Sequence, residues 1–240
     1  MRNLPTMTRY LLIANVIIYF LGYLLERYGV DIVSTFGLFY AGSQWFHWWQ
    51  PITYMFLHAS FGHLFFNMFA LWMFAPAIES AWGTRRFTIY YLVCGLGAAL
   101  VQELVMLATG AGLAGVTIGA SGAVFGILFA FGWLFPDVPM FLLFIPIPIR
   151  ARVFVIIYAV IELLEALQSA AGYSTDNIAH AAHLGGFLIG WLLILYWRKV
   201  KWREPLIFGW WQRLKERFRR SEDSDTRGKD FDNYHYHKRV

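Results

Sequence analysis

Long apolar stretches separated by short polar connections occupy most of the chain. Except for the fourth, each stretch approaches the ~20 residues that a helix needs to cross a bilayer. This pattern predicts an all-α polytopic membrane protein with six transmembrane helices. The stretches lie near Tyr10–Leu25, Gly62–Ser80, Phe87–Ala108, Ala120 or Ser121 to Phe135, Ala151–Gln168 and Ala179–Trp197.

The fourth stretch is too short for a full crossing. Its 15 residues, from Ser121 to Phe135, would form a helix of roughly 22 Å, whereas the hydrocarbon core is roughly 30 Å thick. The preceding segment, 109–115, is uncharged and rich in glycine. Irregular backbone at membrane depth must be buried in protein or line water. We therefore expect a water-filled cavity, open to the outside, with Ser121 at its floor.

The composition supports a membrane class. Hydrophobic residues make up 58% of the 240 residues, and charged residues make up 15%, well below the ~25% of soluble domains. We expect one membrane domain, 1–198, followed by a basic tail, 199–240. The single cysteine, Cys94, lies in an apolar stretch and cannot form an intrachain disulfide.

Basic residues mark alternate connections between the stretches. Thirteen of the 20 Lys and Arg lie in residues 198–240, and the other seven precede them. Six of those seven lie before the first stretch, between the second and third, or between the fourth and fifth; Arg27 is the exception. The positive-inside rule then predicts that both termini are cytoplasmic, with connections 26–61, 109–119 and 169–178 facing outward.

The basic tail carries a second pattern. Five apolar side chains fall on one helical face among basic residues: Ile207, Trp210, Trp211, Leu214 and Phe218. Such a helix is typical of binding to anionic lipid headgroups on the inner leaflet. The tail contains no nucleic-acid-binding motif, so we do not expect a nucleic-acid partner. Beyond Ser221 the chain is polar, and disorder is predicted.

Two polar residues in apolar stretches suggest catalysis. Ser121 begins the fourth stretch and His183 lies near the outer start of the sixth. Polar side chains at bilayer depth are costly and indicate function. A serine hydroxyl is a weak nucleophile without a base, and histidine is the usual base at neutral pH. Small residues spaced by four would let the two helices approach closely: Gly122, Gly126, Gly186 and Gly190.

Candidate oxyanion donors lie on the same outer side. His63 and Asn67 are spaced i, i+4 and share one face of the second stretch. Backbone N–H groups around Gly119 and Ser121, where the fourth helix starts, could contribute further. No aspartate is placed to orient His183, so we expect a Ser–His dyad without metal or cofactor.

The sequence does not fix the roles of the other titratable residues within the apolar stretches. His180 lies one turn from His183, and the sequence fixes no role for it. For Glu162 and Glu165 in the fifth stretch, and Glu103 in the third, the favoured interpretation is burial against polar neighbours. A gating role for Glu162 or Glu165 stays open.

Three ordered motifs resemble the rhomboid family of intramembrane serine proteases. They are His63-x-x-x-Asn67, Gly119-Ala120-Ser121-Gly122 and Ala181-Ala182-His183-x-x-Gly186-x-x-x-Gly190, and Glu79-x-x-x-Gly83 also resembles the family pattern. The resemblance covers about residues 10–198.

The resemblance implies a six-helix rhomboid core, with Ser121 as nucleophile and His183 as base. His63, Asn67 and the Ser121 amide would stabilise the oxyanion. It also implies cleavage of transmembrane substrates near their outer end, gating by the fifth helix and the loop above the cavity, and a form similar to bacterial inner-membrane members.

Two positions depart from the family pattern. The chain has Trp49-Gln50 where many members have Trp-Arg, and Phe125 where some have a tyrosine packed on the histidine. Phe125 keeps the stacking face and lacks the hydroxyl.

Two alternative functions differ from proteolysis in what they require of the sequence. A non-catalytic rhomboid-like module would bind transmembrane segments, but such relatives usually lack the serine or the histidine, and both are present here. A transporter would show symmetric halves and paired charges at the midplane. The sequence shows neither, and we favour an intramembrane serine endopeptidase.

Overall fold

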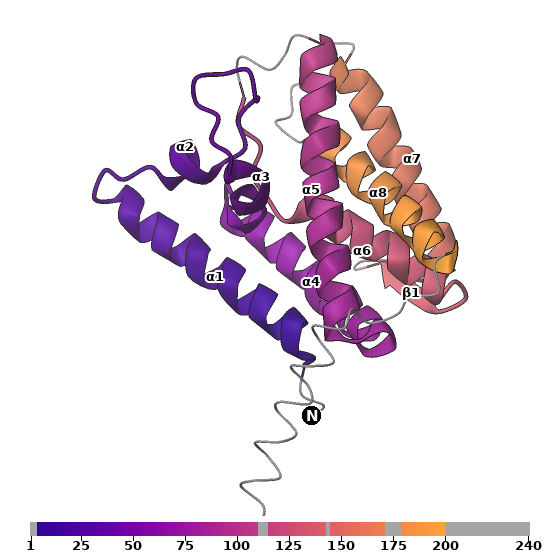
Figure 1. The fold of residues 1–240 in the computed structure, drawn as a ribbon. Coiled ribbons are helices and arrows are strands. Elements are labelled where there is room, and N and C mark those ends of the chain that lie inside the picture. The colour runs from indigo at the N-terminus through magenta and orange to yellow at the C-terminus, as the bar shows by residue number, and fades with distance from the viewer. Residues whose placement is uncertain (1–3, 110–114, 143–144, 171–178, 200–240) are drawn as a thin grey trace, which may run out of the picture. The chain divides into compact units, whose positions relative to one another are not determined.

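The computed structural model describes residues 4–109, 115–142, 145–170 and 179–199, and all statements below concern these residues. The chain divides into two units, Met1–Tyr196 and Trp197–Val240. Most of the second unit, including the predicted tail helix, lies outside the described residues. The architecture that follows is that of the first unit (Figure 1).

A helix forms at each of the six predicted stretches. They are α1 (Thr6–Glu26), α4 (Phe61–Trp82), α5 (Thr84–Thr109), α6 (Ser121–Leu134), α7 (Ala151–Ala170) and α8 (His180–Lys199). The predicted all-α polytopic fold is thus confirmed. By length and composition, four helices could cross a membrane: α1, α4, α5 and α8. Helix α6 is shorter, with 14 residues, or roughly 21 Å.

Helix α6 lies at the centre of the helical packing. It contacts α4, α5 and α7, and most of its side chains are buried, including Ala123, Ile127 and Ala130. Its position between neighbouring helices explains why it need not be long enough to meet lipid at both ends. Helix α1 is peripheral by comparison, with exposed apolar residues such as Ile17 and Phe20.

Glu79 joins the ends of three helices. Its carboxylate accepts hydrogen bonds from the Met7 N–H at 2.9 Å, the Thr8 N–H at 2.8 Å and the Thr8 hydroxyl at 2.7 Å, at the start of α1. The Thr84 hydroxyl at the start of α5 donates a fourth, at 2.7 Å. The first N–H groups of a helix have no intrahelical partner, and an acidic group satisfies them well. Gly83 has a φ of +78°, which favours glycine between α4 and α5.

A short hairpin, which the sequence pattern did not predict, connects α6 to α7. Strands β1 (Pro139–Leu142) and β2 (Ile145–Arg150) pair antiparallel. At its base Asp137 accepts a hydrogen bond from the Arg152 guanidinium at 2.5 Å and lies 3.7 Å from Arg150. The basic residues expected between the fourth and fifth stretches therefore lie on this hairpin and the first turn of α7.

The connection before α4 is folded back on itself. It contains α2 (Ile32–Phe36), α3 (Gln50–Thr53) and the 3-10 turn η1 (Tyr54–Phe56). The fully buried Gln50 amide accepts from the Phe39 N–H and donates to the Trp45 carbonyl at 2.9 Å. Gln50 stands where many members of the family that the sequence resembles have arginine, and here its amide joins two parts of the connection by hydrogen bonds.

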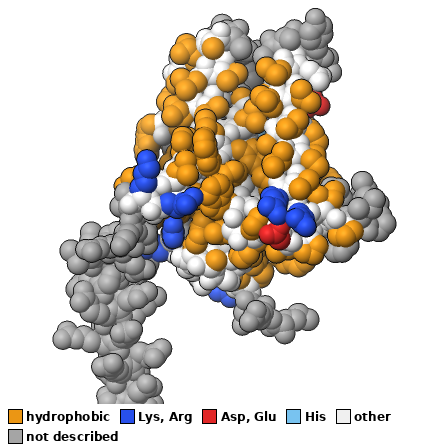
Figure 2. Space-filling model, turned by 90° about the vertical axis from the view of Figure 1, so that its right-hand side faces the viewer, with side chains coloured by type: hydrophobic (Ala, Val, Ile, Leu, Met, Phe, Trp, Pro, Cys, Tyr) orange, Lys and Arg blue, Asp and Glu red, His pale blue; other side chains and the backbone are white. Residues whose placement is uncertain are grey.

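The outer surface of the helices is apolar. Figure 2 shows hydrophobic side chains over most of one face, with charged side chains gathered toward its lower part. Exposed apolar residues occur on every long helix. In water this surface would be unstable, whereas in a bilayer it contacts hydrocarbon. The arrangement supports an integral membrane protein.

Candidate active site

Ser121 and His183 lie within hydrogen-bond distance. The Ser121 Oγ is 2.7 Å from His183 Nε2, although 62 positions separate the two residues. Ser121 is the first residue of α6, and His183 lies in the first turn of α8. A nucleophile hydrogen-bonded to a base is the geometry that proton abstraction requires.

Close packing of α6 and α8 allows this short distance. A Cβ built on Gly186 would collide with the Gly122 carbonyl oxygen, and one on Gly126 would lie 3.2 Å from the Gly186 carbonyl oxygen. A Cβ on Gly122 would also lie 2.5 Å from the Ala98 Cβ of α5. Gly190 has a different neighbour, since its Cβ would collide with the Tyr90 hydroxyl of α5. Small-residue pairs thus bring three helix backbones together beside the candidate site.

Phe125 stacks on the histidine ring. The ring centroids of Phe125 and His183 are 4.3 Å apart, with an interplanar angle of 19°. The expectation that Phe125 keeps the stacking face is confirmed. The stack fixes the plane of the imidazole and covers one of its faces.

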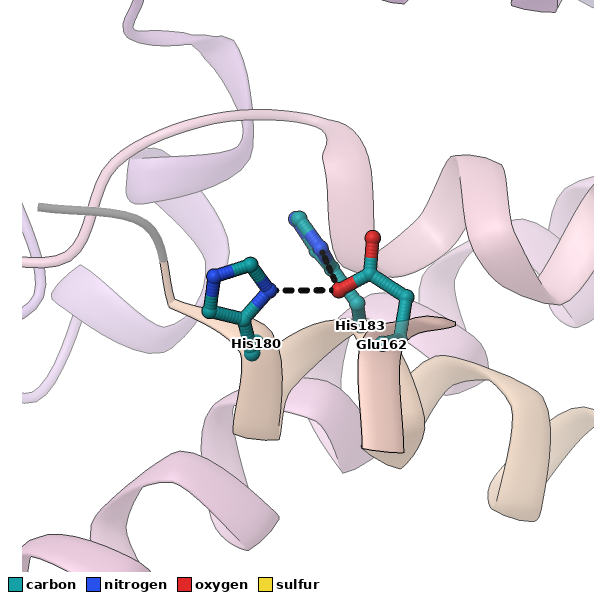
Figure 3. A group of neighbouring side chains, drawn as sticks. All are labelled: Glu162, His180 and His183. Atoms are coloured by element: carbon teal, nitrogen blue, oxygen red, sulfur yellow. Dashed lines mark hydrogen bonds and ion pairs between the residues drawn. The ribbon is translucent and has the colours of Figure 1, made fainter. Parts of the chain in front are cut away.

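The second nitrogen of His183 is also engaged, and this differs from the sequence-based expectation of a dyad. Glu162 of α7 lies 2.8 Å from His183 Nδ1 and 2.7 Å from His180 Nδ1 through the same oxygen, Oε2 (Figure 3). All three side chains are buried. The carboxylate is indeed buried against polar neighbours, but one of them is the candidate base. The sequence held the signals, a His-x-x-His pair and a carboxylate in an apolar helix, without showing that α7 and α8 would align them.

The same three residues could hold a metal ion, since one ligand atom of each lies within 4.8 Å of the others. A zinc ion would stand ~2.0–2.2 Å from each ligand, which would separate the ligand atoms beyond 3 Å. The 2.7 and 2.8 Å distances from Oε2 to the two nitrogens are instead those of hydrogen bonds. The distances fit hydrogen bonds from the two imidazoles to the carboxylate better than coordination of a metal ion by the three residues.

His63 lies close to Gly119 and Ser121. A Cβ on Gly119 would be 2.7 Å from His63 Nε2 and 3.7 Å from Ser121 Oγ, so the imidazole, Gly119 and the hydroxyl are neighbours. His63 Nδ1 accepts a hydrogen bond from the Ala59 N–H at 3.3 Å. In a neutral imidazole the proton is then on Nε2, which lies toward Ser121. This is the orientation that an oxyanion donor needs.

The N–H of Gly119 is not available as a donor, which corrects the expectation for that residue. It donates to the Tyr54 carbonyl at 2.9 Å. Gly119 has a φ of +127°, and any side chain would meet the His63 ring. Its role in the arrangement is conformational: it turns the chain into α6 while leaving room for His63. The N–H groups of the first turn of α6, starting at Ser121, have no intrahelical partners.

Asn67 is less directly placed than His63. Its side chain is buried, and its Nδ2 donates to the His63 carbonyl at 2.9 Å, along its own helix. This bond leaves one amide hydrogen. No described contact joins Asn67 to Ser121 or His183, so its expected oxyanion role stays a prediction.

His58 packs behind His63. The two rings meet edge to face at 4.9 Å, and burial, followed by the proximity of His63, lowers the pKa of His58 to about 4. His58 lines a cavity of about 190 Å³ between α1 and the connection before α4, together with Tyr19, Glu26 and Asp31. Its imidazole is therefore neutral at physiological pH.

The two cavities described here lie away from Ser121, so the expected water-filled cavity above it stays a prediction. A second cavity, of about 230 Å³, is apolar and lies between α6, α7 and α8, lined by residues such as Phe129, Val155 and Trp191. Neither cavity is lined by Ser121. The glycine-rich segment behind that expectation includes 110–114, which lies outside the described residues.

The fold and the site together define a class, a helical membrane protein with a serine and a histidine paired between two helix starts. Comparison with known families places the chain within this class. Residues 45–200, more than half of the chain, match the family model described as the Rhomboid domain. The chain belongs to the rhomboid family.

Several curated proteins are similar to the chain. Rhomboid-like protein 11, chloroplastic, of Arabidopsis thaliana is 34% identical over 61% of the chain and 51% of its own length. Rhomboid protein 1, mitochondrial, of Saccharomyces cerevisiae is 32% identical over 60% of the chain and 40% of its own length. Rhomboid protease GluP of Bacillus subtilis is 30% identical over 60% of the chain and 25% of its own length. The chain thus aligns with a quarter to about half of each of these relatives, which include organellar and bacterial proteins.

Proposed function

We propose that the chain is an intramembrane serine endopeptidase that cleaves transmembrane segments of other proteins near their outer end. The observation that carries the proposal is the 2.7 Å contact between Ser121 Oγ and His183 Nε2 at the start of two apolar helices. The family includes a protein named as a protease, GluP. Two small apolar residues would pack at this position in a membrane at lower cost than a serine and a histidine. The polar pair therefore indicates function.

The first half-reaction would form an acyl-enzyme. The Ser121 Oγ attacks the carbonyl carbon of the scissile amide, and its proton passes to His183 Nε2. The carbonyl electron pair moves onto oxygen and gives a tetrahedral oxyanion. When the C–N bond breaks, His183 returns the proton to the leaving amine, and an ester on Ser121 remains. In the second half-reaction a water gives a proton to His183 Nε2 and attacks the ester carbonyl carbon. When the bond from that carbon to Ser121 Oγ breaks, the acid is released and His183 returns the proton to Ser121 Oγ.

The oxyanion would form beside the start of α6. The N–H of Ser121 and the positive end of the helix dipole face this position. His63 lies close by, with its proton on the nitrogen nearer Ser121, as inferred from the Ala59 contact. We assign His63 as a donor. Asn67 is a supporting candidate that acts through the position of His63, whose carbonyl it binds.

Substrate choice follows from the membrane setting. A transmembrane helix hides its scissile bond within its own hydrogen bonds, and exposing unpaired backbone in hydrocarbon costs several kcal/mol per group. Substrates with small or helix-weakening residues near the outer interface would therefore be preferred. Replacing the residues around a cleaved bond with a run of leucines should abolish turnover, and unchanged turnover would contradict this mechanism.

The membrane placement is part of the proposal. The basic residues at the start of α1, between α4 and α5 and on the hairpin favour a cytoplasmic location of both termini, as the positive-inside rule requires. A bacterial inner membrane is the setting that we propose, although several relatives are named as mitochondrial or chloroplastic. Residues 199–240 would bind anionic lipid headgroups.

The decisive experiment compares the purified full chain with Ser121→Ala in vesicles that contain a model single-pass substrate. Cleavage by the wild type and none by the variant is expected. A fluorophosphonate should label the wild type at Ser121 and leave the variant unlabelled. Equal cleavage by both, or cleavage and labelling by neither, would reject the protease and favour a module that only binds transmembrane segments.

A further inference from the structure

A buried carboxylate touches the candidate base from the side opposite the serine. His183 uses Nε2 for the Ser121 hydroxyl and Nδ1 for Glu162 Oε2, at 2.7 and 2.8 Å. Glu162 belongs to α7, whereas the serine and the histidine belong to α6 and α8. Side chains from three helices therefore form a chain of hydrogen bonds from the Ser121 hydroxyl through the His183 imidazole to the Glu162 carboxylate.

This chain of hydrogen bonds fixes the tautomer of the imidazole. A carboxylate only accepts hydrogen bonds, so His183 Nδ1 must carry the proton that bonds Glu162. In the neutral ring Nε2 is then the acceptor, and it faces the Ser121 hydroxyl. Without Glu162 the other tautomer, protonated at Nε2, would be open to His183, and that tautomer cannot accept the serine proton.

His180 holds the carboxylate from a second direction. Its Nδ1 lies 2.7 Å from the same Oε2 that bonds His183. Figure 3 shows both contacts meeting at one oxygen, with His180 and His183 on one helix and Glu162 on the neighbouring one. A glutamate side chain has three rotatable bonds, and two donors on one oxygen restrict them. His180 therefore orients Glu162, which in turn orients His183.

We infer that Glu162 is a positioning residue for the proposed reaction, anchored by His180, which holds His183 in the tautomer and orientation that accept the Ser121 proton. The inference rests on the proposed function and changes its machinery from a dyad to a serine, histidine and glutamate contributed by three helices. As His183 gains a proton during attack, the adjacent carboxylate also stabilises the imidazolium. This stabilisation is larger at a buried site than in water.

Packing of α7 against α6 helps to place Glu162 beside His183. Gly132 of α6 packs against this helix, since a Cβ there would lie 2.7 Å from Val155 Cγ2. The position of Glu162 is therefore set by the packing of α7 on α6. Glu165, one turn further along α7, has no described hydrogen bond to either histidine and is less buried. It is the matched control, the same residue type on the same helix.

The test uses the full chain in detergent or vesicles and compares Glu162→Gln, Glu162→Asp and Glu165→Gln with the wild type. The amide of Glu162→Gln can donate to His183 Nδ1 and so stabilise the wrong tautomer. In a soluble triad the corresponding acid-to-amide change lowers kcat by ~10⁴-fold. We expect a loss of ~10²–10⁴-fold in kcat and in the rate of fluorophosphonate labelling, with KM changed by less than about threefold. Glu162→Asp should recover part of the loss, and Glu165→Gln should match the wild type.

A second readout does not depend on activity. In protein labelled with ¹⁵N-histidine, the His183 signals, assigned by their absence in His183→Asn, should report a proton on Nδ1 in the wild type and in Ser121→Ala. Glu162→Gln should shift the ring toward the tautomer protonated at Nε2. Because Ser121→Ala removes the nucleophile and keeps Glu162, this signature should persist even if the chain proves not to be a protease.

Three results would overturn the inference. One is a wild-type kcat in Glu162→Gln. Another is a lowered kcat with an unchanged His183 tautomer, which would mean that Glu162 acts only through stability. The third is loss of activity on chelation with EDTA and its return with Zn²⁺, which would assign Glu162, His180 and His183 to a metal. If Glu162→Gln does not fold, the wild-type tautomer alone decides, and a proton on Nε2 would contradict the inference.

Discussion

Within the part of the chain that the structure describes, two carboxylates are buried, Glu79 and Glu162, and their hydrogen-bond partners differ in kind. Glu79 is 2% exposed and accepts four hydrogen bonds from backbone N–H groups and threonine hydroxyls. Glu162 is 8% exposed and contacts two imidazoles. The donors of Glu79 are amides and hydroxyls, whereas those of Glu162 are imidazoles, a group that can accept and donate a proton.

The difference separates a structural carboxylate from one suited to chemistry. Glu79 joins the starts of α1 and α5 to the end of α4, and it touches no candidate catalytic group. Glu162 touches the ring that touches Ser121. Depth in an apolar helix is common to both and does not distinguish them. The chemical nature of the partner distinguishes the two carboxylates. Amide and hydroxyl donors hold a helix end in place, whereas an imidazole can also accept and donate a proton.

The largest expected effect is on stability at Glu79. Glu79→Ala leaves two N–H groups and two hydroxyls without their acceptor, and we expect a loss of about 3–5 kcal/mol. Thermal unfolding in detergent measures it. Activity per folded molecule should stay within about twofold of the wild type. Glu162→Ala should show the converse, a smaller loss of stability and a larger loss of kcat. Equal losses of stability and kcat in the two variants would contradict the distinction between the two carboxylates.

The next effect concerns His63, the proposed oxyanion donor near Ser121. His63→Ala should lower kcat by ~10²–10³-fold, the effect of removing one oxyanion donor, equivalent to about 3–4 kcal/mol. KM should change little, because the donor acts on charge that develops in the transition state. Steady-state kinetics with the single-pass substrate measure both constants. A higher KM with unchanged kcat would place His63 in substrate binding instead.

A smaller effect is expected where packing sets the geometry. Gly186→Ala introduces a methyl group against the Gly122 carbonyl, so α6 and α8 must separate. Overpacking of this kind costs about 1–3 kcal/mol, and a 1 Å displacement of a catalytic group can cost ~10²-fold in rate. Thermal unfolding and kcat should therefore fall together. Gly115→Ala is the control, because nothing lies within 4 Å of its Cβ position, and a loss as large as that of Gly186→Ala would argue against the packing explanation.

The smallest effect appears only below neutral pH. His58 has a pKa of about 4 in the fold against 6.5 when unperturbed, so between these values the unfolded chain binds a proton that the folded chain does not. The contribution of His58 to the free energy of unfolding should therefore be fully present above pH 6.5. It should decline as the pH falls toward 4, by at most about 3 kcal/mol.

Comparison of two phenylalanine variants isolates this contribution. His58→Phe should flatten the decline and leave stability at pH 7 close to wild type, as thermal unfolding over this pH range would show. His47→Phe, at an exposed position, should keep the wild-type pH dependence. An unchanged decline in His58→Phe would assign it to another group.

The sequence predicted the helices well because their signal is local. Length and hydropathy identified six helical stretches, and the shortness of the fourth followed from counting residues between Ser121 and Phe135. The hairpin between α6 and α7 was missed, since its strands are short and apolar and interrupted by proline, without the alternation that predicts a strand. The N–H of Gly119 was misassigned, because only the fold shows that the Tyr54 carbonyl accepts from it.

The sequence by itself determined the membrane class, the helical stretches and the identity of Ser121, His183 and His63 as candidates. These follow from residue type and spacing within single helices, where chain connectivity fixes which side chains share a face. Only the tertiary structure decided that Glu162 bonds His183 while Glu165, three residues away, does not. Which turn of α7 faces α8 depends on how both helices pack against α6. That choice is made by contacts between residues far apart in the chain, and no local pattern contains it.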